Sequence, residues 1–212
     1  MLQVIALIAA ALTAPAPQLS PNITNPYWPM KPGSRWVYRE ARHKKVVVTV
    51  PERTETIMGT KTRVVHDVVT EKGRLVEDTY DWYAQDGKGN VWYMGEATKE
   101  YPSGRSTGSW RAGVNGAQPG IVVPARPKIG ASYRQEYLKG EAEDMARNMS
   151  LDEQVTVPQG HYNRVFMTSE WTPLEPKLHG YKFYARGVGP VLAVDVSPSP
   201  AFEQLVAFKS GA

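Results

Sequence analysis

Apolar and polar residues alternate along several short stretches of the chain, and a period of two is the pattern of a half-buried β-strand. Other stretches are rich in valine, threonine and aromatic residues, which also favour strands. The stretches with one of these patterns are 34–40, 46–50, 62–70, 79–84, 91–95, 131–137, 154–157, 163–171, 181–186 and 191–196. Turn residues separate many of them, so the chain is predicted to be mainly β, with an antiparallel sheet.

The clearest hairpin is predicted between Asp78 and Glu96, around the turn "QDGKGN". Gly and Asn tolerate positive φ there, and Asp86 can accept hydrogen bonds from its own turn. The alternation gives the hairpin two faces. One carries Tyr80, Trp82, Ala84, Trp92 and Met94, and the other carries Asp81, Tyr83, Gln85, Val91 and Tyr93. Ring pairs across neighbouring strands stabilise a hairpin, so these rings do not by themselves require a ligand.

The chain also resembles itself at a constant offset. A shift of 101 positions places Gly59 on Gly160, Tyr80 on Tyr181 and Tyr83 on Tyr184. A repeat of this kind indicates that one supersecondary unit occurs twice. We therefore predict a curved antiparallel sheet or half-barrel built from two duplicated halves, at about 27–96 and 127–208. Residues 97–126 have no counterpart and are predicted to form a long loop insertion.

One short helix is predicted over Lys139 to Met149, "KGEAEDMARNM". The segment is rich in Ala, Glu and Met, which favour helices, and its acidic residues would lie near the positive end of the helix dipole.

Composition and charge then narrow the classes of function. Apolar residues make up 42% of the chain and charged residues 22%, which is typical of a globular protein. The net charge of +4 comes from residues spread along the sequence, and the densest basic cluster is short. A nucleic-acid-binding surface would need a denser basic stripe or a recognisable module, so no nucleic-acid partner is expected.

The N-terminal residues indicate export. Leu2 to Leu12 is apolar except for Gln3, and the small-residue pattern Ala14-x-Ala16 follows it. This is typical of a signal segment, predicted at residues 1–17, and the run is too short to span a bilayer. We therefore expect one β domain over residues 18–212, in the periplasm or secreted, with no transmembrane span. The chain has no cysteine, which excludes disulfides and thiolate metal sites.

Two groups of acidic residues are candidates for chemistry. If the protein is an enzyme, the acids near the predicted helix would serve as the paired carboxylates of a glycosidase: Glu136, Glu141, Glu143 and Asp144. Acids in a first helical turn are also explained by the helix dipole alone. The acids of the 78–96 hairpin faintly resemble a calcium loop, but Lys88 occupies a ligand position. The four histidines have no metal-binding spacing, so neither a metal nor a cofactor is expected.

Aromatic residues are the candidates for ligand binding. In a curved sheet with two related halves, rings from both halves can share the concave face and form a groove with the insertion. The predicted ligand-binding residues are Trp36, Trp82, Trp92, Trp110, Tyr133 and Phe183.

Two resemblances bear on function. The segment "YARGVGPVLAVDV", Tyr184 to Val196, resembles the closing hairpin of the LolA/LppX-like lipoprotein carriers, in which a curled sheet holds an apolar molecule. The segments "DWYAQDGKGNVWYMGE", "GAQPGIVVPARPKIGASYRQEYLKGEAEDM" and "YARGVGPV" together resemble a set of uncharacterised secreted bacterial β-rich proteins. The first resemblance implies a carrier fold, and the second implies export without implying an activity.

These observations favour a non-catalytic binding or carrier protein outside the cytoplasm, whose partner is a small hydrophobic or amphiphilic molecule. Two alternatives stay open. One is a carboxylate-dependent enzyme acting on a polysaccharide or cell-envelope polymer. The other is a structural factor that binds an envelope protein through the segment from Gly95 to Arg126.

Overall fold

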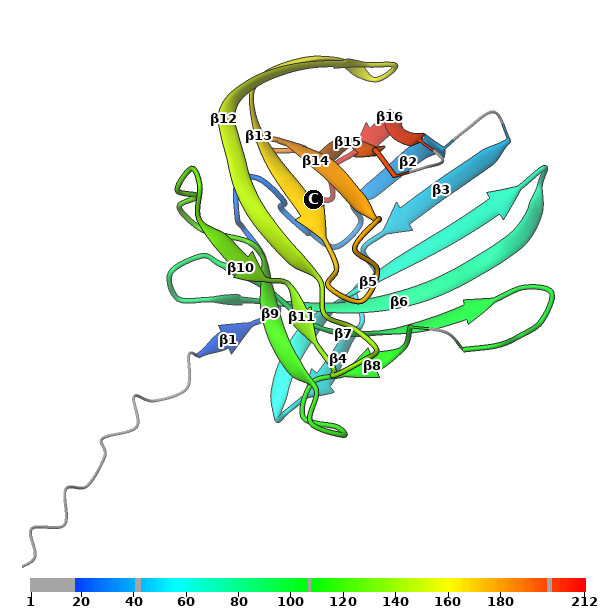
Figure 1. Ribbon diagram of the computed structural model, residues 1–212, viewed down its shortest axis with the longest axis vertical. Helices are drawn as coiled ribbons and strands as arrows, with labels where there is room; N and C mark the ends of the chain where they lie inside the picture. The colour runs from blue at the N-terminus through cyan, green and yellow to red at the C-terminus, as the bar shows by residue number, and fades with distance from the viewer. Residues whose placement is uncertain (1–17, 41–42, 107, 198–199) are drawn as a thin grey trace, which may run out of the picture.

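The structure is a computed structural model that describes residues 18–40, 43–106, 108–197 and 200–212. The predicted signal segment, residues 1–17, lies outside the described residues. Sixteen strands make up the described fold (Figure 1). They are β1 (Leu19–Ser20), β2 (Arg35–Glu40), β3 (Lys44–Thr49), β4 (Thr54–Ile57), β5 (Thr60–Glu71), β6 (Arg74–Asp86), β7 (Val91–Glu100), β8 (Trp110–Arg111), β9 (Gln118–Val123), β10 (Ser132–Arg134), β11 (Glu136–Tyr137), β12 (Met145–Val157), β13 (Gly160–Trp171), β14 (His179–Ala185), β15 (Gly189–Asp195) and β16 (Ala201–Lys209).

All strand pairs in the sheet are antiparallel, which confirms the predicted mainly β, antiparallel character of the fold. The order across the sheet is β10-β12-β13-β14-β15-β16-β2-β3-β5-β6-β7-β9-β11, with β1, β4 and β8 paired beside it. The two ends of this order, β10 and β11, are separated in the chain by Gln135 alone. Residues 132–137 therefore pair with β12 on one side and β9 on the other, and they curl the sheet into a nearly closed barrel (Figure 1). The sheet is thus more closed than the predicted half-barrel.

The duplication stays a prediction. Strands β2, β3, β5, β6, β7 and β9 form one antiparallel succession, and β10 and β12 to β16 form another. This matched order is compatible with two related halves, but the same order can arise without a common ancestor.

The predicted helix over residues 139–149 is wrong. The chain turns at Leu138 to Ala142, with Gly140 at positive φ, and continues as β12 from Met145. Ala146 and Asn148 are buried while Arg147 and Met149 are exposed, which is the alternation of a strand. Pairing with β13 on one side and β10 on the other outweighs the helix propensity of this segment.

The predicted long loop at residues 97–126 is only partly a loop. It contains the end of β7 and the strands β8 and β9, and β9 belongs to the barrel wall between β7 and β11. Three residues of this segment, Trp110, Ala112 and Ala117, are themselves buried in a core cluster. The segment is therefore part of the packed structure rather than a protruding loop.

The N-terminal segment, residues 21–34 between β1 and β2, closes one end of the barrel. Ile23, Tyr27 and Met30 are at most 3% exposed and belong to the main core cluster. Asn25 donates hydrogen bonds from its side-chain amide to the carbonyl oxygens of Gly89 and Pro124, which lie at the strand ends here. The barrel is therefore a cup that has an apolar floor at this end.

Candidate ligand cavity

A cavity of about 390 Å³ lies inside the barrel, above the floor formed by the N-terminal segment. Its volume is in the range of small-molecule binding pockets. A second hollow of about 440 Å³ shares Asp67, Glu77 and Glu203 with it. The second hollow is also lined by Glu40, Glu71 and Glu100, each the last residue of its strand, so it forms the mouth of the cup.

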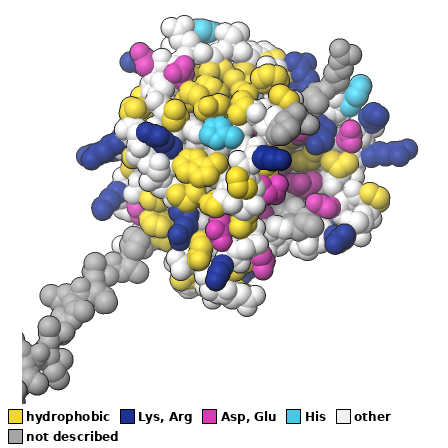
Figure 2. Space-filling view, in the orientation of Figure 1, with side chains coloured by type: hydrophobic (Ala, Val, Ile, Leu, Met, Phe, Trp, Pro, Cys, Tyr) yellow, Lys and Arg dark blue, Asp and Glu magenta, His cyan; other side chains and the backbone are white. Residues whose placement is uncertain are grey.

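Acidic residues dominate the charge inside this cavity. Seven carboxylates line it: Asp67, Glu77, Asp81, Glu96, Glu136, Asp144 and Glu203. Lys182 is the one basic side chain among the described residues of the lining. Figure 2 shows acidic side chains gathered on the side of this face where β5 and β6 run. The interior is thus strongly acidic although the whole chain carries a net charge of +4.

Aromatic rings form the floor and part of the wall. The centroids of the Trp28 and Tyr83 rings are 5.2 Å apart, and those of Tyr83 and Tyr93 are 4.9 Å apart and stacked. Tyr184 lies on the other side of Trp28, with 6.2 Å between centroids. A Cβ atom on Gly189 would come within 2.7 Å of the Trp28 ring, so glycine at this position makes room for the indole.

A β-bulge aims Glu96 into the cavity. The pairing of β6 with β7 shifts between Trp82 and Tyr83, so that Trp82 faces Gly95 and Tyr83 faces Tyr93. The extra residue in β7 changes the alternation, and Glu96 points inward on the same side as Tyr93. Gly95 has φ of 131°, and a Cβ atom there would lie 2.4 Å from the carbonyl oxygen of Trp110. This bulge therefore requires glycine.

Tyr93 joins two carboxyl groups through one hydroxyl. Its oxygen lies 2.6 Å from Oδ1 of Asp81 and 2.7 Å from Oε2 of Glu96, which face each other across β6 and β7. A phenol has one proton to donate, so both contacts are hydrogen bonds only if one carboxyl group is itself protonated. Burial, with the charge of Asp81 added, raises the pKa of Glu96 to about 8. Burial raises the pKa of Asp81 to about 6, and the hydrogen bond from Tyr93 opposes this rise.

The pKa values of other acids on the cavity wall are raised as well. Burial, followed by the charge of Asp81, raises the pKa of Asp67 to about 8, and burial raises that of Glu203 to about 7. Oδ1 of Asp67 is buried and has no hydrogen-bond partner within the described structure. Burial and the charge of Asp144 raise the pKa of Glu136 to about 7. Several of these groups therefore change protonation near neutral pH.

Lys182 is already paired. Its Nζ lies 2.9 Å from Oε2 of Glu170, and the charge of Glu170 raises the pKa of Lys182 to about 12. Its positive charge is therefore largely balanced by Glu170 and leaves most of the lining acids without a cationic partner.

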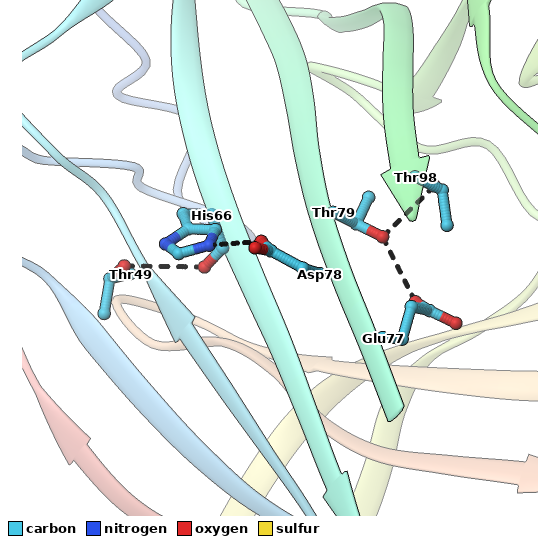
Figure 3. Close-up of polar contacts among 6 residues, drawn as sticks. All are labelled: Thr49, His66, Glu77, Asp78, Thr79 and Thr98. Atoms are coloured by element: carbon cyan, nitrogen blue, oxygen red, sulfur yellow. Dashed lines mark hydrogen bonds and ion pairs between the residues drawn. The ribbon is translucent and has the colours of Figure 1, made fainter. Parts of the chain in front are cut away.

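The two faces of β6 differ in the polar pairs they carry (Figure 3). On the cavity side, the Thr79 hydroxyl lies 3.2 Å from Oε1 of Glu77 and 3.1 Å from the Thr98 hydroxyl. On the opposite side, His66 Nε2 lies 2.7 Å from Oδ1 of Asp78. The His66 ring stacks on Tyr80, with 4.3 Å between centroids. The outer pair is a half-exposed surface contact, whereas the inner one positions a carboxylate on the cavity wall.

The six predicted ligand-binding rings lie elsewhere. Among the described residues that line the cavity, none is Trp36, Trp82, Trp92, Trp110, Tyr133 or Phe183. Trp36 is 1% exposed in the main core, where its indole N–H donates to the Val188 carbonyl. Trp82 and Trp110 lie in a second buried cluster, and Trp92 packs against that cluster. Phe183 packs against the main core, and Tyr133 pairs with Ala146 in the closing strand.

The predicted acids divide into two pairs. Glu136 and Asp144 line the cavity, although no helix brings them together. Glu141 and Glu143 do not line it: Glu141 borders a separate outer hollow with Asp144, and Glu143 accepts a hydrogen bond from the Gly140 amide. Sequence reasoning missed Trp28, Asp67, Tyr93 and Glu203 as site residues. The alternation of the sequence does place Tyr93 and Asp81 on one face of the hairpin, so this part of the cavity lining could have been predicted.

No three carboxylate or histidine side chains within the described part of the chain are grouped so that they could hold a metal ion. The described residues also include no helix with the length and apolar character needed to cross a membrane.

No protein-family model matches the chain, and no curated protein matches it. Among solved structures, it is similar to one from Bacteroides fragilis NCTC 9343, a protein thought to be exported and of YmcC-like fold. The identity is 14%, the match covers 92% of this chain and 100% of that chain, and the TM-score is 0.51. It is also similar to a protein from Parabacteroides distasonis ATCC 8503 thought to be a lipoprotein, with 15% identity, 86% and 98% coverage and a TM-score of 0.48.

The first likeness shows a shared fold. Neither description names the LolA/LppX group, so the resemblance to those carriers stays a prediction.

Proposed function

We propose that this protein works outside the cytoplasm and holds a small amphiphilic molecule inside its barrel without catalysing a reaction. The observation that carries the proposal is the 390 Å³ cavity, which has aromatic rings at its floor and carboxylates on its wall. The mixed lining favours an amphiphilic ligand over a purely hydrophobic one, because an apolar ligand would remove water from the carboxylates without replacing their hydrogen bonds. The similar Bacteroides protein, thought to be exported, and the predicted signal segment support the location.

The proposal can be tested by filling the cavity. Ala193 of β15 lines it, and the exposed Val196 directly follows the end of the same strand. Ala193→Trp places an indole in the cavity without changing the charge of the protein. Val196→Trp adds the same indole at a position that is 47% exposed and serves as the matched control.

Native mass spectrometry of the three proteins, purified from the original host, reads out the occupancy. We expect a bound small molecule in the unchanged protein and in Val196→Trp, and its loss in folded Ala193→Trp. An unchanged protein that is consistently empty, or a molecule retained equally in Ala193→Trp, would contradict binding in this cavity.

A second candidate is the carboxylate-dependent enzyme, and one observation favours it. Glu136 and Asp144 both line the cavity, and a carboxyl group with a pKa of about 7 suits a general acid near neutral pH. In this case the protein would hydrolyse a cell-envelope polysaccharide, and Glu136→Gln would lower the rate by about 100-fold or more without lowering stability. Absence of any turnover by the unchanged protein on such polymers would remove this candidate.

A further inference from the structure

The charge inside the cavity is not balanced by the protein itself. Seven carboxylates face one lysine among the described lining residues, and Glu170, outside that lining, already pairs with the lysine. Carboxylates that leave water remain ionised only if a positive charge compensates for the lost hydration. Several of these groups are therefore expected to hold protons when no cation is bound, and a cationic ligand can replace those protons.

The Asp81, Tyr93 and Glu96 cluster is where this exchange is best defined. One oxygen of each carboxyl group lies within 2.7 Å of the Tyr93 phenol oxygen. The phenol donates one proton, so both contacts are hydrogen bonds only when one of the two carboxyl groups carries a proton as well. The charged groups that face the cluster come from its own strands and from the neighbouring walls. They are Glu77 of β6, Asp67 of β5, Glu136 of β11, Asp144 before β12 and Lys182 of β14. Lys182 favours ionisation of the cluster, and so does His66 of β5, which lies on the other face of the sheet.

A second observation also points to a missing partner. Oδ1 of Asp67 is inaccessible to solvent and has no hydrogen-bond donor within the described residues, although Asp67 borders both hollows. A buried carboxylate oxygen without a donor makes the ionised form of Asp67 costly. A cation bound beside Asp67 in either hollow would lower that cost by its charge.

The shape of the site favours an organic cation over a metal ion. The acids are spread around the wall, and no three of the described carboxylate or histidine groups converge on one point. Rings from Trp28, Tyr83 and Tyr184 lie at the floor, and aromatic faces attract ammonium groups as well as apolar chains. We propose that the ligand is an organic amine: an amphiphile whose ammonium head lies against Asp81 and Glu96 and displaces the proton that they share through Tyr93.

This inference rests on the proposed binding function, and three probes with the same octyl chain separate the two. The probes are octyltrimethylammonium, 1-octanol and octyl sulfate, measured below their micelle concentrations by isothermal titration calorimetry at pH 7. We expect the cationic probe to bind at least about tenfold more tightly than octanol, which corresponds to about 1.4 kcal/mol, and octyl sulfate to bind most weakly.

Binding of the cation should also release protons. Titrations in two buffers with different heats of ionisation should therefore give different apparent enthalpies for octyltrimethylammonium and equal ones for octanol.

The matched variants replace the same two types of acid, one Asp and one Glu, at two places. Asp81→Asn with Glu96→Gln removes two acids from the cavity, whereas Glu52→Gln with Asp152→Asn removes two exposed acids. We expect the cavity pair to weaken octyltrimethylammonium binding at least about tenfold and to abolish proton release, with octanol affinity unchanged. The exposed pair should behave like the unchanged protein. Asparagine and glutamine are neutral and close in shape to the protonated acids, so the cavity pair should fold, and its urea unfolding curve checks this.

The outcomes distinguish the two proposals. If octanol binds as tightly as the cation, or if the cavity pair leaves cation binding and proton release intact, the amine inference is overturned while the binding function stands. If none of the three probes binds the unchanged protein and native mass spectrometry finds it empty, the proposed function itself fails, and the inference fails with it.

Discussion

The two faces of the β6–β7 hairpin have similar aromatic content and opposite surroundings. On one face, Trp82 and Met94 pack with Trp110 in a dry cluster outside the barrel. On the other, Tyr83 and Tyr93 border a cavity beside two carboxyl groups. The outer rings stabilise the sheet, and the inner ones shape a site. Aromatic residues on a strand therefore indicate a ligand only where the neighbouring residues leave space and unpaired polar atoms beside them.

The largest effect is expected at the residue that separates the two faces. Gly95→Val would place a branched side chain where even a Cβ atom lies 2.4 Å from the Trp110 carbonyl oxygen, at a φ of 131°. The bulge that turns Glu96 inward would be lost, so we expect no stably folded protein, a loss above about 4 kcal/mol. Circular dichroism and the yield of soluble protein measure this.

Gly87→Ala in the turn of the same hairpin is the control. No atom lies within 4 Å of a Cβ built at Gly87. The variant should be close to neutral, within about 1 kcal/mol. Normal stability of Gly95→Val would show that the bulge is not needed.

A smaller loss is expected on the outer face. Trp82 is 8% exposed, and Trp82→Ala would leave a cavity in the cluster that it forms with Met94 and Trp110. We expect a loss of about 3–5 kcal/mol in the free energy of unfolding. Probe binding by the molecules that remain folded should be unchanged, since Trp82 does not line the cavity. A folded Trp82→Ala protein that loses binding would place the ligand on the outer face instead.

The dependence of stability on pH reports the inner face. The pKa of Asp81 rises from 3.8 when unfolded to about 6 in the fold, so the folded state binds its proton more tightly. This contribution to stability is fully present below the unfolded pKa and is lost as the pH rises through about 6. The change corresponds to about 3 kcal/mol for Asp81. Glu96 adds a loss in the same direction as the pH rises through about 8.

Urea unfolding followed by tryptophan fluorescence at pH 5, 7 and 9 measures this dependence. We expect the unchanged protein to be most stable at pH 5 and the Asp81→Asn, Glu96→Gln pair to show a flatter profile. Equal stability of the unchanged protein at pH 5 and pH 9 would mean that these acids are not buried as the structure has them.

The sequence by itself determined what depends on neighbouring residues. The alternation predicted the strands and the two faces of the 78–96 hairpin, and Asp86 does hold its turn, where its carboxylate accepts from the amides of Lys88 and Asn90. These features need only a period of two and a local hydrogen bond, which can be read along the chain.

Only the tertiary structure decided which face is the inside and what it contains. Asp67, Asp81, Glu136 and Glu203 are far apart in the sequence and meet because residues 132–137 close the sheet. The same closure makes residues 145–149 a strand, although their composition favours a helix. Pairing between distant strands sets the curvature of the sheet, and curvature determines which side chains share a cavity. No local pattern carries that information.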